Sequence, residues 1–218
     1  MRLTITIYLD VISSWCFWAI PAWEELKKRY ADRVDFRWKI ALMDKTGLPP
    51  THESMDWYYR RSGVLMRSPV KLQSSWHEIG REEYPEPNCV AEAARDLGIE
   101  DDRVWQALGR AELVEGKKIW QWEVAGEVAA AASGLAKAQL LERAQTPEIE
   151  ARIRRTTEEF HGLNVTQRPT FVIDTPIGDR AIFSGFAKAA PIAATLDAML
   201  ADLTDYAAHA AHFGEPPA

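Results

Sequence analysis

The N-terminal part of the chain switches twice between strand and helix periodicity, and this limits the kind of sheet it can build. Leu3–Leu9 alternates apolar and polar side chains, which predicts a strand with one buried face. Apolar residues recur at helical spacing from Ile20 to Tyr30, and Val34–Ile40 alternates again. A strand, a helix and a strand in so short a stretch predict a βαβ unit with parallel strands and a right-handed crossover.

The turn from the first strand into this helix reads Ser13-Ser14-Trp15-Cys16. A Cys-x-x-Cys pair at such a turn would exchange disulfides, but a serine beside a lone cysteine cannot do so. The first turn of a helix has unpaired N–H groups and partial positive charge, which stabilise a thiolate or another developing anion. Ser13 or Ser14 is equally suited to cap the helix, and both interpretations stay open on the local pattern.

Residues 55–162 have almost entirely helical periodicity and follow a Gly/Pro-bearing loop at 43–54. Prolines and glycines divide this segment into several helices, and Thr146-Pro147 is typical of a helix start. Because the segment is far too long for a loop, we predict an all-helical insertion domain at 55–162.

Strand patterns return after the insertion. Thr170–Ile173 and Ala181–Phe183 flank a turn, which predicts a β-hairpin. An Ala- and Leu-rich helix is expected from about Ala189 to Leu203, and 206–218 is expected to be a frayed C-terminal tail. Residues 1–54 and 163–205 then give the order β-α-β followed by β-β-α, which predicts an α/β domain interrupted by helices.

Composition narrows the classes of function. The net charge is −6 with both signs interspersed, which argues against a nucleic-acid partner. The sequence lacks an apolar run of the roughly 18 residues that a membrane span needs. The first strand follows Met1-Arg2 directly, so we expect no signal peptide and a cytoplasmic protein. Two cysteines do not supply a Cys-rich zinc site, and His209 and His212 lack a third ligand, so no metal is expected.

Two segments and the helical insertion together resemble those of a known protein family. The segments are Asp10-Val-Ile-Ser-Ser-Trp-Cys-Phe17 and Arg168-Pro-Thr-Phe-Val-Ile173. The chain resembles the DsbA-like branch of the thioredoxin superfamily. It is most similar to the FrnE-like dithiol oxidoreductases, the 2-hydroxychromene-2-carboxylate isomerases and the kappa-class glutathione transferases. The resemblance covers Leu3 to about Leu203. It implies a thioredoxin-like fold with a large helical insertion, and a homodimer.

The resemblance also implies roles for individual residues. Pro169 is expected to be a cis-proline facing the turn, with the Arg168 main chain offering an edge to glutathione or a peptide. Without the resemblance, a proline before a strand would be a trans strand starter. Ser13 matches the serine that isomerases and transferases use to stabilise a glutathione thiolate. Contacts with the thiol cofactor are further expected from Ser14, Trp15 and Ser184.

The chain departs from these relatives in two places. FrnE-like proteins carry Cys-Pro-Trp-Cys, of which only Trp15 and Cys16 are present. Glutathione-using relatives hold the γ-glutamyl end with a Ser-Asp or Asn-Asp pair, and no carboxylate stands near Ser184-Gly185-Phe186. Cys16 is expected to be buried with a raised pKa, and no pairing with Cys89 is expected. A disulfide oxidase with two thiols is therefore disfavoured.

We expect an enzyme that uses glutathione or another low-molecular-weight thiol to isomerise or modify a small hydrophobic or aromatic substrate, with Ser13 and Cys16 as catalytic residues. Substrate contacts are expected from Trp18, Trp57 and Asn88, although Asn88 also suits a helix cap. Two other functions stay open. One is a FrnE-type thiol–disulfide oxidoreductase acting through Cys16, and the other is a non-catalytic, chaperone-like protein that binds peptides along the Pro169 edge.

Overall fold

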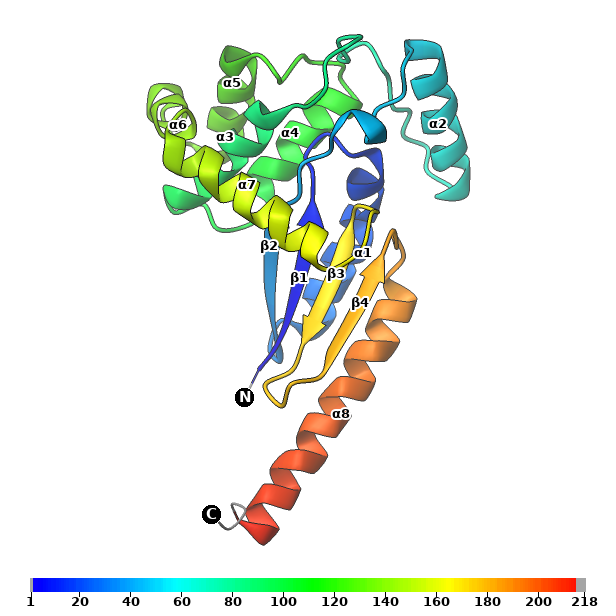
Figure 1. The fold of residues 1–218 in the computed structure, drawn as a ribbon, viewed down its shortest axis with the longest axis vertical. Coiled ribbons are helices and arrows are strands. Elements are labelled where there is room, and N and C mark those ends of the chain that lie inside the picture. The colour runs from blue at the N-terminus through cyan, green and yellow to red at the C-terminus, as the bar shows by residue number, and fades with distance from the viewer. Residues whose placement is uncertain (1, 215–218) are drawn as a thin grey trace.

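A computed structural model of the protein describes residues 2–214 (Figure 1). Its four strands form one mixed sheet in the order β2-β1-β3-β4, with the bounds β1 (Leu3–Leu9), β2 (Val34–Ile40), β3 (Thr170–Asp174) and β4 (Arg180–Ser184). β1 pairs in parallel with β2, with Leu3 opposite Val34. β3 pairs antiparallel with both β1 and β4. The βαβ unit and the hairpin expected from the sequence are both present.

Helices cover both faces of the sheet. The odd-numbered residues of β1 point into a core shared with α1 (Ser14–Tyr30) and the first part of α8 (Ala189–Phe213). On the other face, Tyr8 packs against Phe160 of α7 (Pro147–Gly162), with 6.1 Å between the ring centroids. β1 is thus buried on both sides, which places the turn at its C-terminal end between layers.

The insertion consists of six helices between β2 and β3. After a short 3-10 turn at Lys45–Gly47, these are α2 (His52–Leu65), α3 (Pro85–Asp96), α4 (Arg103–Leu113), α5 (Trp122–Ser133), α6 (Lys137–Ala144) and α7. Helices α3 to α7 pack together, whereas α2 stands to one side of them (Figure 1). Residues 67–84, expected to be mostly helical, instead form an irregular connection. Arg67 has φ 50°, and Pro69 lacks the N–H that a helix needs.

α8 does not end near Leu203 as expected. It runs on to Phe213, through most of the segment expected to be a frayed tail. Alanines at 207, 208, 210 and 211 explain the difference, since alanine has the highest helix propensity. Residues 215–218 of the expected tail lie outside the described residues. Within residues 2–214, no helix combines the length and the apolar character that crossing a membrane requires.

Candidate active site

Ser13 precedes the first residue of α1, in the turn that follows β1, and its side chain is buried. Its backbone is extended (φ −77°, ψ 117°), and its Oγ accepts a hydrogen bond from the Cys16 N–H at 3.4 Å. The Ser13 N–H donates to the Asp10 carbonyl at 3.0 Å, which closes the turn. Ser13 is therefore the N-cap residue, as the local pattern allowed. The cap uses the hydroxyl oxygen as an acceptor and leaves the hydroxyl hydrogen free to donate.

The buried side chain of Asp10 holds the turn through hydrogen bonds. Asp10 Oδ1 accepts from the Ile12 N–H at 3.2 Å, and Oδ2 accepts from the Met43 N–H at 2.6 Å. Burial raises the pKa of the Asp10 carboxyl, and these hydrogen bonds partly offset that effect. Because Met43 follows β2, the side chain of Asp10 joins the loops that leave two neighbouring parallel strands.

Asn88 lies beneath the same turn. Its Oδ1 accepts from the Val11 N–H at 3.1 Å, and its Nδ2 donates to Asp10 Oδ1 at 2.8 Å and to the Tyr84 carbonyl at 3.0 Å. The residue is fully buried and lies inside α3, whose N-cap is Tyr84. The expectation that Asn88 caps a helix is therefore wrong. A role in substrate contact is not supported by this position, because the side chain is occupied in holding the turn.

Both cysteines are buried and free. Cys16 is 2% exposed and Cys89 is 3% exposed. Burial raises the pKa of each thiol to about 12, and the Ser13 hydroxyl offsets this only in part for Cys16. A thiol whose pKa is raised this far stays protonated at neutral pH. Since the thiolate is the attacking species, neither side chain is suited to disulfide exchange.

Arg168 and Pro169 lie on the segment before β3. The peptide bond between them is cis, and the Pro169 carbonyl accepts from the Gly185 N–H at 2.9 Å. The Arg168 guanidinium donates to the carbonyls of Ala41 and Leu42 at 2.5 and 2.6 Å. Its positive charge lies close enough to oppose the burial-driven rise in the pKa of Cys16. Within residues 2–214, the backbone N–H and carbonyl of Arg168 have no hydrogen-bonding partner.

Two cavities meet at Ser13. The first, of about 380 Å³, has a mixed polar lining that includes Asp44, His161 and the segment Thr166–Arg168. The second, of about 320 Å³, is more apolar and includes Met55, Tyr58, Tyr59 and Trp76. Both are bordered by a common set of residues: Ser13, Trp15, Met43, Thr46 and Gly47. A molecule in either cavity would therefore lie next to Ser13.

The other residues expected near a thiol cofactor lie around this junction. Trp15 borders both cavities, and Ser14 borders the apolar one. Ser184 lies behind the polar cavity, where its Oγ accepts from Thr170 Oγ1 at 3.2 Å and donates to the Gln167 carbonyl at 3.4 Å. Ser184 thereby supports the segment that borders the cavity.

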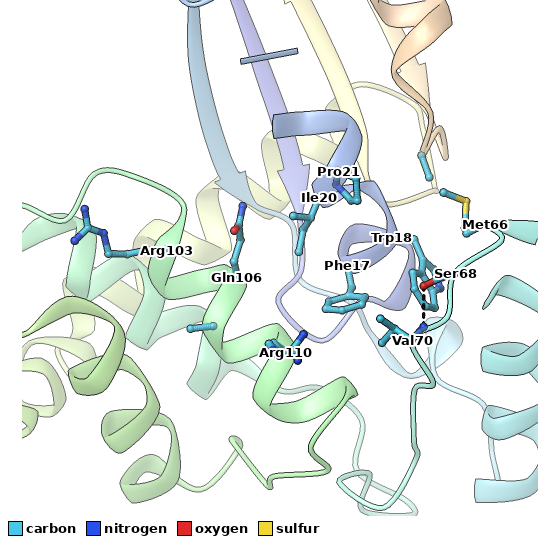
Figure 2. A pocket seen from close by; sticks show the side chains of 12 residues that line it. Phe17, Trp18, Ile20, Pro21, Met66, Ser68, Val70, Arg103, Gln106 and Arg110 are labelled. Carbon is cyan, nitrogen blue, oxygen red and sulfur yellow. Dashed lines mark hydrogen bonds between the residues drawn. The ribbon is translucent and has the colours of Figure 1, made fainter. Parts of the chain in front are cut away.

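The two tryptophans expected to contact substrate lie elsewhere. Trp18 is buried and donates from Nε1 to Ser62 Oγ at 2.9 Å. It lines a third cavity, of about 710 Å³, between α1 and α4, together with Phe17, Ile20 and Pro21 (Figure 2). Trp57 is 53% exposed on α2 and packs edge-on against Tyr58. The structure thus brings the neighbours of Trp57, and not Trp57 itself, to the Ser13 site.

Several lining residues were not anticipated. Met43, Thr46 and Gly47 come from the loop after β2, and Tyr58 and Tyr59 come from α2. One signal was available for the loop, because ligands bind at the carboxyl ends of parallel strands and β1 and β2 form such a pair. The tyrosines gave no such signal, since their place depends on how α2 folds over the loop.

The comparisons with known proteins agree with this architecture. The chain matches the DSBA-like thioredoxin domain family over residues 4–197. A candidate protein disulfide isomerase from Nitrosomonas europaea superposes with a TM-score of 0.74 at 16% identity, covering 93% of this chain and 99% of that one. The cytosolic disulfide reductase DsbM from Pseudomonas aeruginosa superposes with a TM-score of 0.68 at 17% identity, covering 90% and 98%.

DsbM has also been solved with GSH, and that structure superposes with a TM-score of 0.64 at 17% identity, covering 90% of this chain and 98% of that one. No curated protein sequence matches the chain significantly. At such identities the structural neighbours show a shared fold, and the match to the family covers most of the chain. The protein therefore belongs to the DSBA-like thioredoxin domain family.

Proposed function

We propose that the protein binds glutathione or a similar small thiol beside Ser13 and uses it to isomerise a small hydrophobic substrate or to add the thiol to it. One observation carries the proposal. A hydroxyl, and not a thiol, stands at the helix N-cap where two cavities meet, while Cys16 behind it is 2% exposed. The reactive sulfur is therefore expected to come from a bound molecule.

The polar cavity has the donors and acceptors that a small thiol peptide needs. The first turn of α1 presents backbone N–H groups next to Ser13, and the Arg168 backbone offers an N–H and a carbonyl for strand-like pairing. Asp44 adds a carboxylate that borders the cavity, and its hydrogen bonds from Thr46 lower its pKa and keep it ionised. Asp44 thus supplies the negative charge that is missing near Phe186, and we propose that it binds the α-ammonium group of glutathione.

Residues around the Ser13 junction would favour the loss of the proton from the bound thiol and stabilise the thiolate that results. Such a thiol would supply a nucleophilic sulfur that adds to an electrophilic or conjugated carbon. The Ser13 hydroxyl would donate its free hydrogen to the thiolate, and the helix N-terminus and Arg168 would add positive potential. These effects favour the ionised thiol at neutral pH. Asp10 holds the turn in the shape that points Ser13 toward the junction.

The apolar cavity defines the substrate class. Its side chains include Met55, Tyr58, Tyr59 and Trp76, and its volume of about 320 Å³ suits a compact aromatic or aliphatic molecule. Because it shares a border with the polar cavity, a substrate here would lie next to the thiol site. This adjacency favours chemistry between a thiol and a hydrophobic small molecule over binding of a long peptide.

A disulfide reductase remains the second candidate, because the neighbour DsbM is described as a cytosolic disulfide reductase and has been solved with GSH. In that case a thiol of this chain has to take part, and the burial of Cys16 and Cys89 counts against it. Under either function we propose a cytoplasmic location, where low-molecular-weight thiols are kept reduced.

Calorimetric titration tests the proposal with two ligands. Glutathione should bind the wild-type protein, and Ser13→Ala should weaken that binding by about 10- to 100-fold, the range for a lost hydrogen bond to a charged group. S-methylglutathione cannot form a thiolate, so it should bind the wild type and Ser13→Ala equally. Ser75→Ala, an exposed serine outside both cavities, is the matched control. Absence of glutathione binding at millimolar concentration, or equal losses for both ligands, would contradict the proposal.

A further inference from the structure

A cavity of about 710 Å³ lies between α1 and α4, on a part of the fold that the proposed function does not use. Among the residues that the structure describes, none lines both this cavity and either of the two cavities at Ser13. Its volume falls within the range of roughly 300 to 1,000 Å³ that small-molecule sites have. The cavity between α1 and α4 is therefore separate from the Ser13 site and large enough for one organic ligand.

Apolar side chains form much of the wall of this cavity. Phe17 and Ile20 reach it from successive turns of α1, and the buried Trp18 lies beside them (Figure 2). The rings of Phe17 and Trp18 pack edge-on, with 5.3 Å between their centroids. Met66 and Val70, which follow α2, complete the apolar lining. Such a wall suits the apolar body of a ligand, because contact removes apolar surface from water on both partners.

Helix α4 adds polar groups to the same cavity. Gln106 and Arg110 are four residues apart, so they lie on one face of the helix, and both line the cavity (Figure 2). The Arg110 guanidinium is only weakly paired. Its Nε lies 4.0 Å from one carboxylate oxygen of Glu115, while the other oxygen lies 2.9 Å from Lys117 Nζ. Arg110 therefore has N–H donors left for a ligand.

The charge of the lining selects the class of ligand. Within the described part of the chain, the charged residues that line this cavity are Arg103 and Arg110. Arg103 already donates to both carboxylate oxygens of Asp101. A guanidinium presents its donors in a fork that fits a carboxylate. We propose that the cavity binds an amphipathic carboxylate, with its apolar body against Phe17 and Ile20 and its carboxylate accepting hydrogen bonds from Arg110.

Calorimetric titration of the full chain with two probes of equal shape tests the charge selection. Naphthalene-2-carboxylate should bind the wild type at submillimolar concentration, and the neutral naphthalene-2-carboxamide should bind roughly tenfold more weakly. Arg110→Gln should weaken carboxylate binding by about tenfold and leave carboxamide binding unchanged, because it removes the charge and keeps a donor. Arg33→Gln, at an exposed arginine outside the cavity, is the matched control and should bind both probes as the wild type does.

A second pair of variants tests where the probes bind. Ala107→Phe puts a ring into the cavity, so it should weaken the binding of both probes by at least tenfold. Ala131→Phe, at an exposed alanine of α5, should not. Circular dichroism shows whether Ala107→Phe folds, and Arg110 is exposed, so the charge test holds in either case. None of the four substituted positions lines the Ser13 cavities, so failure of glutathione to bind would leave this proposal standing.

Three results would overturn the proposal. One is a wild type that binds neither probe at millimolar concentration. Another is unchanged binding in Ala107→Phe, which would mean that the probes bind elsewhere, including the apolar cavity at Ser13. The third is equal affinity of the wild type for the two probes, or an equal loss of both in Arg110→Gln, because either result would show that the charge of Arg110 does not recognise the ligand.

Discussion

Glu112 is a fully buried carboxyl on α4 whose ionisation should set much of the pH dependence of stability. Both of its carboxyl oxygens lack a hydrogen-bonding partner within residues 2–214. Burial raises the pKa of Glu112 well above its ordinary value of 4.5, and the nearby Asp10 carboxylate raises it further. Glu112→Gln removes the titration and keeps the size and polarity of the side chain.

The sign and size of the effect follow from proton linkage. Below about pH 4.5, Glu112 carries its proton in both the folded and the unfolded chain, so the wild type and Glu112→Gln should have similar free energies of unfolding. Above that pH the unfolded chain releases a proton that the folded chain retains. The wild type should therefore lose about 1.4 kcal/mol per pH unit relative to Glu112→Gln until the folded pKa is reached. The gap should therefore widen as the pH rises from 5, for as long as the folded chain keeps the Glu112 proton.

Urea unfolding of the two proteins at pH 5, 6 and 7 measures this gap directly, and Asp10 titrates in both proteins, so its contribution largely cancels. Glu142→Gln, at an exposed glutamate, provides a control that should show no widening gap. A difference between the wild type and Glu112→Gln that does not change with pH would refute the reasoning. It would mean that Glu112 ionises in the folded protein as it does in the unfolded chain.

Three further predictions concern the turn and the thiols. Asn88→Leu should lower the free energy of unfolding by about 1 to 3 kcal/mol in urea melts, because it removes one hydrogen bond to the buried Asp10 carboxyl and leaves the Val11 N–H without a partner; a loss below 1 kcal/mol would contradict this. Gly109→Ala places a Cβ only 3.1 Å from the Val11 carbonyl, so it should lower the free energy of unfolding by about 1 to 3 kcal/mol and weaken thiol binding. Unchanged binding would show that the turn adapts to the added methyl group. Cys16 and Cys89 should react with a chromogenic disulfide reagent only after unfolding, and one fast equivalent in the native protein would favour the reductase function.

The sequence predicted those parts of the site that depend on local pattern. The end of β1 and the start of α1 follow from two periodicities, which placed Ser13 at a helix N-terminus before any contact was known. The burial of Cys16, which the family resemblance implies, is confirmed. The end of the strand and the start of the helix can be predicted because both depend on the local sequence pattern.

The remaining parts depend on how distant segments pack. Nothing in the local sequence shows that Asn88 reaches back to Asp10, because the two residues meet only when α3 folds under the turn. Tyr58 and Tyr59 line a cavity and Trp57 does not, since helical geometry turns adjacent side chains in different directions. The sequence expectation ends α8 too early, because a chain end without tertiary contacts is expected to fray, whereas the alanines keep it helical to Phe213.

The two sides of the Ser13 junction are held in different ways. On one side, the hydrogen bonds of Asp10 and Asn88 fix the turn to α3 and to the loop after β2. The other side is formed by α2, which stands apart from the helical cluster and is attached through an apolar group around Met55 and Tyr59 and through the hydrogen bond from Trp18 to Ser62. Under the proposed function, a hydrophobic molecule would enter the junction from the side of α2, because displacing α2 breaks none of the hydrogen bonds that hold the Ser13 turn.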